Sequence, residues 1–578
     1  MEKRVLLAVV LSFIVLYGYQ ALFPPPEPQR VPQQQEQPAA QPSPGPAQAT
    51  IAEPARPQEV PEPEAPGVAP LIADSAEQDI VFENESVRGV FSNRGGVIKS
   101  WRLKKYLDAA REPLELVPQD APAGAPRPFS LSLDDAVLTR TLASALYKPS
   151  ATSLDVTDSP QTLVFEYQDS AGVSVRKEFG FHPDSPYVVH FTARVRRGTE
   201  ELVPAIQWGP AIGTALDMNS LGYNAPPQPI YSVAGDVERV DVDDVPAAPT
   251  QEGAFDFIGV SDHYFLSATV RPKERVRVSY EVVSLPARTQ GEKPPPPYVA
   301  WTARFPSAPE GTPFFFGPKD FDVLAAVDRD LVRAIHFGVF SPLVVPLLRA
   351  LKWINGYVGN YGWSIIVLTI LINLAMFPLR HKSVVSMRKM QEIQPEIKAI
   401  QERYAKLKMT DPARQKMNTE MMQLYKQRGV NPASGCVPML LTLPVLFAFY
   451  SMLSVAIELR GAPFIGWIKD LSTYDPLFIT PVLMGATQFI QTKMTPSTAD
   501  PMQQRIMLLM PLMFMFMFIW APSGLVLYWT VSNLWAIGQQ AVTNRIIGPM
   551  PDRTVRPPAE RRVKTAGGGR TDAAKERR

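Results

Sequence analysis

Cysteine and histidine are scarce in this sequence of 578 residues, which has one Cys and five His. A single cysteine excludes an internal disulfide framework and any zinc or iron–sulfur site built on several thiolates. The histidines are scattered without the spacing of metal ligands, and a Gly-x-x-x-x-Gly-Lys-[Ser/Thr] phosphate loop is absent. We therefore expect a protein without metal or cofactor.

An excess of one charge sign is also lacking, because 58 Lys and Arg nearly balance 56 Asp and Glu, for a net charge of +2. This average hides very unlike segments. At the N-terminus, Lys3 and Arg4 precede an apolar run from Val5 to Tyr19, which is typical of a cleaved signal peptide or of an uncleaved anchor. Because Pro24 follows where cleavage would need small residues, the sequence favours an anchor with a cytoplasmic N-terminus.

Proline, in contrast, is abundant, at 60 of 578 residues, which is about twice the usual ~5 %. The segment 24–77 mixes many of these prolines with Gln, Ala and Glu. Such a composition cannot bury enough apolar surface to offset the entropy of ordering. We therefore predict an extended tether after the anchor.

Long apolar runs are confined to the second half, apart from the anchor. Each is near the ~20 residues that cross the hydrocarbon core of a bilayer. The run from Met510 to Phe518 is apolar on every side, which argues against core helices of a soluble protein. With the anchor, these runs predict six transmembrane helices. The runs are Gly362–Leu379, Cys436–Ile457, Pro476–Ile490, Ile506–Trp520 and Leu525–Val542.

The distribution of basic residues predicts the orientation of these helices. Twelve Lys or Arg stand against five acidic residues between Arg380 and Arg428, and the tail after Gly548 is also basic. Basic segments of this kind stay in the cytoplasm. Both termini are therefore expected inside, and residues 24 to about 355 outside, in a periplasm-like space.

The outer region reads as a series of short strands. The stretches 163–168, 173–181 and 187–196 alternate apolar and polar residues, and turn-forming residues separate them. About 250 residues with little helical periodicity predict a β-sandwich. Asp262-His263 is its only adjacent acid–His pair, and we interpret this histidine as structural, so we expect no enzyme here.

Between the second and third spans, apolar residues recur at spacings of three and four, which predicts two amphipathic helices in an antiparallel hairpin. Pro395 predicts a kink in the first of them. The hairpin is either a solvated basic surface or an arm that touches an anionic partner. The repeating positions are Ile393, Ile397, Ile400, Tyr404 and Leu407, then Met417, Met421, Leu424 and Arg428.

The central portions of the five C-terminal spans contain no Asp, Glu, Lys or Arg. A transporter usually needs such groups inside the membrane, so this class is disfavoured. Each of the polar residues that are present is an ordinary partner for a hydrogen bond between helices, but together they can line a hydrated groove. They are Thr369, Asn373, Thr442, Thr487, Gln488, Ser532 and Asn533.

Methionine is concentrated in the same half, since all but 2 of the 20 lie after residue 370. Flexible thioethers suit a surface that binds many different apolar sequences. In the run around Met513, an equally good explanation is that the methionines face the lipid and have no role in binding.

Several motifs make the chain similar to a known family over essentially its whole length. It resembles the YidC membrane-protein insertase family in its long Gram-negative-type form. The matching motifs are Gly362–Ile366 leading to Phe377–Leu379, Gly435–Pro438, Asp475–Pro476, Asp500–Gln504, Pro522–Trp529 with Val531–Asn533, Asn93–Gly96, and Gly259 with Asp262–Phe265.

The resemblance implies a multi-domain protein of the bacterial inner membrane. A polytopic α-helical core of six spans would carry a five-helix groove, beside a periplasmic all-β super-sandwich and a cytoplasmic helical hairpin. Such a protein inserts and helps fold nascent inner-membrane proteins, alone or with the Sec translocon. Its basic tail and cytoplasmic loops would contact the ribosome, and no DNA is expected as a partner. The alternative functions are a small-solute transporter or channel and, less favoured, an anchored envelope enzyme.

Taken together, these observations divide the chain into thirteen segments. They are the anchor 1–23, the linker 24–77, the β-super-sandwich 78–328, an interfacial amphipathic helix 329–358, the second span 359–380, the hairpin 381–430, the third span 434–457, a periplasmic loop 458–475, the fourth span 476–492, a cytoplasmic loop 493–505, the fifth span 506–521, the sixth span 524–543 and the basic tail 549–578.

The resemblance also implies the site, with one departure. The family usually carries an Arg five residues before the Pro of Phe377-Pro378-Leu379, where this chain has Asn373. Without this arginine, the groove works by hydration alone, which is the interpretation we prefer, or Arg380 at the cytoplasmic mouth replaces the missing positive charge. The expected groove residues are Asn373, Thr369, Thr442, Leu446, Gln488, Tyr528, Trp529, Ser532 and Asn533, with Arg380 and Asp500 at the mouth.

Overall fold

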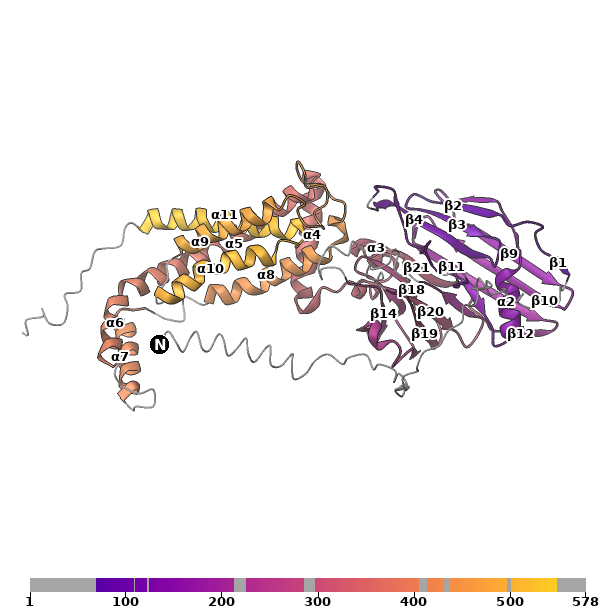
Figure 1. Cartoon of the computed structure of the whole chain (residues 1–578), viewed down its shortest axis with the longest axis horizontal. Coiled ribbons are helices and arrows are strands. Elements are labelled where there is room, and N and C mark those ends of the chain that lie inside the picture. Colours follow the sequence, from indigo (N-terminus) through magenta and orange to yellow (C-terminus); the bar gives the residue numbers. More distant parts are fainter. Residues whose placement is uncertain are drawn as a thin grey trace, which may run out of the picture. The chain divides into compact units, whose positions relative to one another are not determined.

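The computed structural model describes residues 69–108, 110–121, 124–210, 212, 225–284, 297–404, 413–430, 437–495 and 501–547. The expected anchor, nearly all of the Pro-rich linker and the basic tail lie outside these residues. Strands occupy the first part of the described chain and helices the second (Figure 1).

Three sheets form the strand-rich domain in the described residues, which confirms the all-β class predicted for it. The largest sheet contains β1 Pro70–Ile72, β9 Gln161–Asp169, β10 Val173–Phe181, β11 Val188–Arg197, β21 Thr312–Pro318, β18 Phe265–Val270, β17 Phe257–Ser261, β14 Gln228–Val233 and β15 Asp236–Arg239 in that order, with β7 Lys148–Pro149 and β12 Glu200–Leu202 beside it. The second runs β16 Thr250–Gly253, β19 Val276–Val283, β20 Tyr298–Arg304, β13 Ala205–Trp208 and β6 Ser130–Ser132. The third runs β5 Pro113–Glu115, β4 Val97–Leu107, β3 Val87–Ser92, β2 Asp79–Glu83 and β8 Ser153–Asp155.

Strand β10 shows how the sequence pattern produces the sheet. Its side chains alternate between buried and partly or fully exposed along all nine residues, as the two-residue period of a strand requires. The turn before it holds Gly172 at a positive φ of 84°, which costs glycine little. The Asp169 carboxylate accepts a hydrogen bond of 2.9 Å from the Val173 backbone N–H and so closes the turn.

The core of the domain is built from aromatic side chains. Trp208 stacks on Trp301 with ring centroids 5.6 Å apart, and Phe129 packs against Trp208 at 4.7 Å. All three rings are almost completely buried. Aromatic pairs of this kind add ~0.5–1.5 kcal/mol each beyond the area that they bury.

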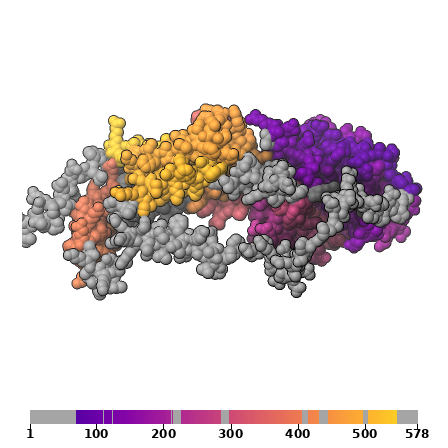
Figure 2. Space-filling view, in the orientation of Figure 1, coloured from indigo at the N-terminus to yellow at the C-terminus, as the bar shows by residue number. Residues whose placement is uncertain are grey.

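Ten α-helices and four short 3-10 turns lie within the described residues. Helix α11 packs against both α5 and α9, and α4 packs against α5 and α8. Figure 2 shows α8 to α11, coloured orange to yellow, as closely packed atoms. The helices are α2 Ala136–Ser144, α3 Phe321–Val327, α4 Ser341–Val358, α5 Tyr361–Glu392, α6 Gln394–Arg403, α7 Ala413–Gln427, α8 Val437–Val455, α9 Ile479–Met494, α10 Pro501–Met517 and α11 Ser523–Ile547, with turns η1 Val242–Asp244, η2 Leu331–Ala334, η3 Gly338–Phe340 and η5 Ile457–Leu459.

In the described part of the chain, α5 is the one helix long and apolar enough to cross a membrane. Shorter apolar helices cover Pro444–Val455 within α8 and Gln504–Met517 within α10. The count of six spans therefore stays a prediction. Helix α5 begins at a capping residue, because the Asn360 side chain accepts a hydrogen bond of 3.1 Å from the Trp363 N–H.

The predicted kink at Pro395 is wrong. Helix α5 continues to Glu392, twelve residues past the expected end of the span, and the chain then breaks at Ile393. Helix α6 starts at Gln394, so that Pro395 lies in its first turn. A proline there loses no hydrogen bond, because first-turn N–H groups have no partner within the helix.

Contacts between α6 and α7 use part of the predicted apolar repeat. Ile393 and Ile397 are buried with Val430, and Met421 and Leu424 pack against this cluster. The Tyr404 hydroxyl donates a hydrogen bond of 2.7 Å to the Glu420 carboxylate. Leu407 lies outside the described residues.

Helix α4 occupies the place of the predicted interfacial helix. Its buried face consists of Val344, Leu348, Leu351 and Ile354, spaced as a helical stripe. The Lys352 ammonium lies 2.6 Å from the Asp322 carboxylate of α3 and 3.2 Å from the Glu458 carboxylate of η5. Its contact with the outer leaflet stays a prediction.

Candidate functional site

A pocket of about 350 Å³ lies among α5, α8, α9 and α11. It brings seven of the predicted groove and mouth residues together. Amide and hydroxyl side chains line most of it, and one cation faces it. The lining residues are Arg380, Ser383, Val384, Leu446, Gln488, Gln491, Thr495, Tyr528, Trp529, Ser532, Asn533, Ala536, Gln539 and Gln540.

Helix α11 supplies half of these residues and is held at its start by backbone contacts. Its first residue, Ser523, donates hydrogen bonds of 2.7 Å from both its N–H and its hydroxyl to the Thr473 carbonyl. The next residue is Gly524, where a Cβ would lie 3.2 Å from the Leu471 carbonyl oxygen. The absence of a side chain there lets α11 approach the preceding loop closely.

Helix α9 is positioned by the carboxylate of Asp475, which belongs to the motif Asp475–Pro476. This carboxylate is buried and accepts hydrogen bonds from the Leu477 and Thr480 N–H groups, at 2.9 and 2.7 Å. It also accepts one of 2.9 Å from the Trp467 indole. A buried carboxylate that accepts several N–H bonds orders the chain just before the helix.

The cation of the pocket is Arg380, and Asn373 orients it. The Arg380 guanidinium donates a hydrogen bond of 2.8 Å to the Asn373 side-chain oxygen. The amide nitrogen of Asn373 donates in turn to the Thr369 carbonyl at 2.8 Å. Seven residues make about two helical turns, so Asn373 and Arg380 lie on the same face because α5 stays helical past Pro378.

The opposite wall is formed by α9 and α11. The Trp529 indole donates a hydrogen bond of 3.0 Å to the Gln488 side-chain oxygen. The Asn533 amide donates to the Thr487 hydroxyl at 3.2 Å and to the Met484 carbonyl at 3.3 Å. These bonds fix polar groups at the pocket wall without introducing a charge.

Aromatic rings pack behind the part of the pocket wall that Tyr528 and Trp529 form. Tyr528 stacks on Phe449 of α8 with ring centroids 4.4 Å apart and nearly parallel planes. Trp529 packs against Phe514 and Phe518 of α10 at 5.8 and 5.0 Å. An apolar aromatic layer therefore supports this wall.

The sequence reasoning missed three glutamines of the pocket, Gln491, Gln539 and Gln540. The side-chain oxygen of Gln539 is buried and accepts no hydrogen bond from the described residues. A buried acceptor of this kind calls for water or a bound polar group. Helical spacing could have found Gln539, since it lies seven residues after Ser532 on α11.

Some predicted residues are not part of the pocket. Thr369 is buried, and its hydroxyl donates to the Ile365 carbonyl at 2.6 Å. Asn373 reaches the pocket through Arg380 rather than by lining it. The side chain of Thr442 and the whole of Asp500 lie outside the described residues.

Among the described residues, no three His, Cys, Asp or Glu side chains are close enough together to hold a metal ion. The side chains that line the pocket offer hydrogen bonding, hydration and the attraction of one guanidinium for a negative charge. Together these can hold a polar or acidic chain segment in the bundle.

Comparisons with known proteins cover nearly the whole chain. Residues 353–549 match the family described as 60Kd inner membrane protein, and residues 79–350 match the family described as YidC periplasmic domain. The protein named Membrane protein insertase YidC from Geobacter metallireducens is 36% identical over 561 residues, which cover 95% of this chain and 99% of that protein. Its namesake from Geobacter sulfurreducens is 36% identical over 567 residues, with the same coverage. A solved structure described as an active YidC insertase is 18% identical, with a TM-score of 0.34, and the match covers 82% of this chain and 94% of that one.

Proposed function

Because the chain belongs to the YidC family of membrane protein insertases, we propose that it inserts membrane proteins through the pocket among α5, α8, α9 and α11. Insertion is the activity for which its relatives are named. The strand-rich domain corresponds to the family's periplasmic domain, and helices α5 to α11 correspond to its inner-membrane region.

The observation that carries this proposal is the Arg380 guanidinium, oriented by Asn373 in a pocket of uncharged polar side chains. The polar end of a client is costly to move through lipid, because one charge at the bilayer centre costs ~2.5–3.5 kcal/mol or more. A wet polar pocket shortens the dry path. Arg380 adds attraction for an acidic end, which supports a role for this residue beside hydration.

The apolar segment of the client then needs a route into the lipid. Exposed apolar side chains are plentiful on two helices next to the pocket, such as Phe447 and Tyr450 on α8 and Leu512 and Phe516 on α10. We propose that the segment slides out along these helices, the third and fifth predicted spans. Its own partitioning into lipid drives the step, so that no nucleotide and no covalent catalysis are needed.

The remaining parts of the proposal concern topology and partners. Six spans with both termini in the cytoplasm agree with the distribution of basic residues. The basic tail 549–578 and the cytoplasmic segments near α6, α7 and residues 493–505 are the proposed ribosome contacts, by electrostatic attraction to RNA. Cooperation with the Sec translocon and antiparallel packing of α6 and α7 belong to the same proposal.

The function is tested by reconstitution of the purified chain into liposomes. We expect a small radiolabelled test membrane protein, made by translation in vitro, to become protected from protease without added nucleotide. Liposomes without the chain are the control. Ion-coupled uptake of small solutes with no protection of the client would favour the transporter alternative, and enzymatic activity of the strand-rich domain would favour an envelope enzyme.

We expect residues that line the pocket to be accessible to water, and residues exposed on the outer surface of the helices to be covered by lipid. In a background with Cys436→Ser, which removes the single cysteine, Ser532→Cys should react with a water-soluble maleimide in proteoliposomes. Leu534→Cys, at a residue that is 52% exposed on the outward face of α11, should react at least about tenfold more slowly, because a thiol in hydrocarbon does not ionise. Equal or reversed rates would contradict a hydrated groove.

A further inference from the structure

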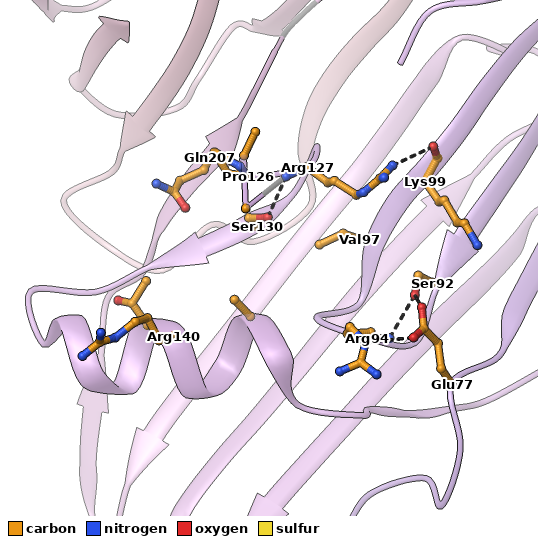
Figure 3. Close-up of a pocket in the computed structure, with 14 residues that line it drawn as sticks. Glu77, Ser92, Arg94, Val97, Lys99, Pro126, Arg127, Ser130, Arg140 and Gln207 are labelled. Atoms are coloured by element: carbon orange, nitrogen blue, oxygen red, sulfur yellow. Dashed lines mark hydrogen bonds and ion pairs between the residues drawn. The ribbon is translucent and has the colours of Figure 1, made fainter. Parts of the chain in front are cut away.

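A second pocket, of about 460 Å³, lies in the strand-rich domain and has no part in the proposed groove. Figure 3 shows that its lining side chains come from several elements. Arg94 comes from the turn between β3 and β4, Lys99 from β4, Arg127 from the loop before β6, and Arg140 from α2. The other lining residues are Glu77, Ser92, Val97, Gly124, Ala125, Pro126, Ser130, Thr139, Ala143 and Gln207.

The charges at this pocket are unbalanced, because four of the lining residues are cations and one, Glu77, is a carboxylate. Of the cations, Lys99 is paired with the Asp79 carboxylate beside the pocket, at 2.8 Å. Glu77 lies 2.9 Å from the Arg94 guanidinium, and this partner holds the pKa of Glu77 below its usual value. Neither Arg127 nor Arg140 has an ion-pair partner within the described part of the chain. The pocket therefore retains donors and positive charge for a ligand.

The backbone around the pocket is held by a buried lysine on the neighbouring sheet. The Lys177 ammonium donates hydrogen bonds to the Gly95, Gly96 and Phe129 carbonyls, at 2.7, 3.1 and 2.8 Å. Gly95 and Gly96 have positive φ angles of 74° and 57°, a conformation that glycine adopts readily. These carbonyls are thus directed to Lys177, while the neighbouring Arg94 is exposed at the pocket.

The lysine thereby joins the two segments that carry Arg94 and Arg127. Arg127 is further fixed by its guanidinium, which donates a hydrogen bond of 3.1 Å to the Lys99 carbonyl. The motif Asn93–Gly96 thus has a local role as part of a built, preorganised wall, which lowers the entropic cost of binding a ligand.

We infer that this pocket binds a phosphate group. Guanidinium groups match the oxygens of phosphate in geometry and charge. Four cations less the two carboxylates of Glu77 and Asp79 leave an excess of two positive charges, which a doubly charged phosphate monoester matches better than a single carboxylate does. The hydroxyl of Ser130 and the amide of Gln207 add donors from the other sides. The volume exceeds that of phosphate itself, so the ligand carries a small organic group.

The test is calorimetric titration of the full chain in a maltoside detergent and phosphate-free buffer. The probes are inorganic phosphate, glycerol 3-phosphate and glycerophosphoglycerol, the soluble headgroup of an anionic lipid. Saturable binding of any of them supports the phosphate site. Tightest binding of glycerol 3-phosphate assigns it to a soluble monoester, and tightest binding of glycerophosphoglycerol assigns it to a lipid headgroup.

Three variants make the result specific to the pocket. Arg140→Gln should weaken binding about tenfold, since a charged hydrogen bond contributes ~1.5–3 kcal/mol. Glu77→Gln should tighten binding about threefold by removing the competing carboxylate, which a misfolded variant would not do. Arg194→Gln removes an exposed arginine outside the pocket, paired with Glu310, and should change nothing. No saturable binding by the unmodified chain, or the same affinity in all three variants, would overturn the inference.

Discussion

Replacing Arg380 by Gln should reduce insertion of a client with an acidic N-terminal tail by about tenfold or more, while a client with a neutral tail is inserted within about twofold of the unmodified rate. The reason is that Arg380 is the cation of the pocket among the described residues. A charge-assisted hydrogen bond is about twice as strong as a neutral one, and ~1.4 kcal/mol corresponds to a factor of ten. Protease protection of the two clients in proteoliposomes measures the effect.

A second substitution separates charge from shape. Asn373→Arg in the Arg380→Gln background moves the cation two helical turns deeper on the same face of α5. Insertion of the acidic client should recover at least partly. By contrast, Asn373→Ala alone should have a mild effect on neutral tails, because hydration of the pocket persists.

The matched control is Arg545→Gln, which removes an exposed cation near the end of α11 that does not line the pocket. It should leave both clients unaffected. Equal losses for acidic and neutral clients in Arg380→Gln would show that the residue supports the structure rather than attracts the tail. Hydration alone would then account for the groove.

The largest expected effect on stability is that of Lys177→Met, which should lower the free energy of unfolding of the strand-rich domain by about 3 kcal/mol or more. The substitution leaves the Gly95, Gly96 and Phe129 carbonyls in place without their donor, and each buried unsatisfied group costs ~1–3 kcal/mol. For a domain of this size, the unfolding midpoint should fall by ~6–12 °C. Tryptophan fluorescence follows this transition, because Trp208 and Trp301 lie in its core.

The difference in the free energy of unfolding between the unmodified protein and Lys177→Met should also depend on pH. Burial lowers the pKa of Lys177 from 10.5 to about 7, so between these values the unfolded chain binds a proton that the folded chain does not. The free energy of unfolding of the unmodified protein should therefore increase as the pH rises between these two values. Lys177→Met lacks the titrating group. The difference in the free energy of unfolding between the unmodified protein and this variant should therefore widen from pH 7 towards pH 10.

Lys105→Met provides the control, because Lys105 is exposed on the same sheet as the glycine turn. It should stay within about 0.5 kcal/mol of the unmodified protein at all pH values, as is usual for surface substitutions. A Lys177→Met midpoint equal to that of the control would contradict the role of Lys177 as a hydrogen-bond donor. A difference in the free energy of unfolding that narrows as the pH rises would contradict the lowered pKa of this group.

Local patterns were sufficient wherever one face of an element alone decides its structure. The alternation from Val173 to Phe181 predicted β10 to the residue, and α4 forms within the segment 329–358 for which an amphipathic helix was predicted. The polar side chains of the pocket, such as Gln488 and Asn533, were also visible, because uncharged polar residues stand out in apolar runs. Short-range periodicity carries this information directly.

Contacts between distant residues decided the rest. The fall in hydropathy at Arg380 suggested the end of a helix, but α5 continues, supported by contacts such as His381 with Thr543 and Arg388 with Asn544 of α11. This continuation places the Arg380 guanidinium against Asn373. Hydropathy measures the preference of a residue for lipid, not the packing that keeps a helix going.

The amino-acid sequence by itself determined the class of each region, namely strands, then apolar helices with polar residues on them. The tertiary structure decided which side chains meet: Arg380 with Asn373 in one pocket, and Lys177 with the carbonyls behind another. The periodicity of apolar and polar residues extends over a few residues and can be read directly from the sequence. The position of a charge depends on groups brought together from distant segments, such as His381 and Thr543, which are 162 residues apart, and only packing specifies such contacts.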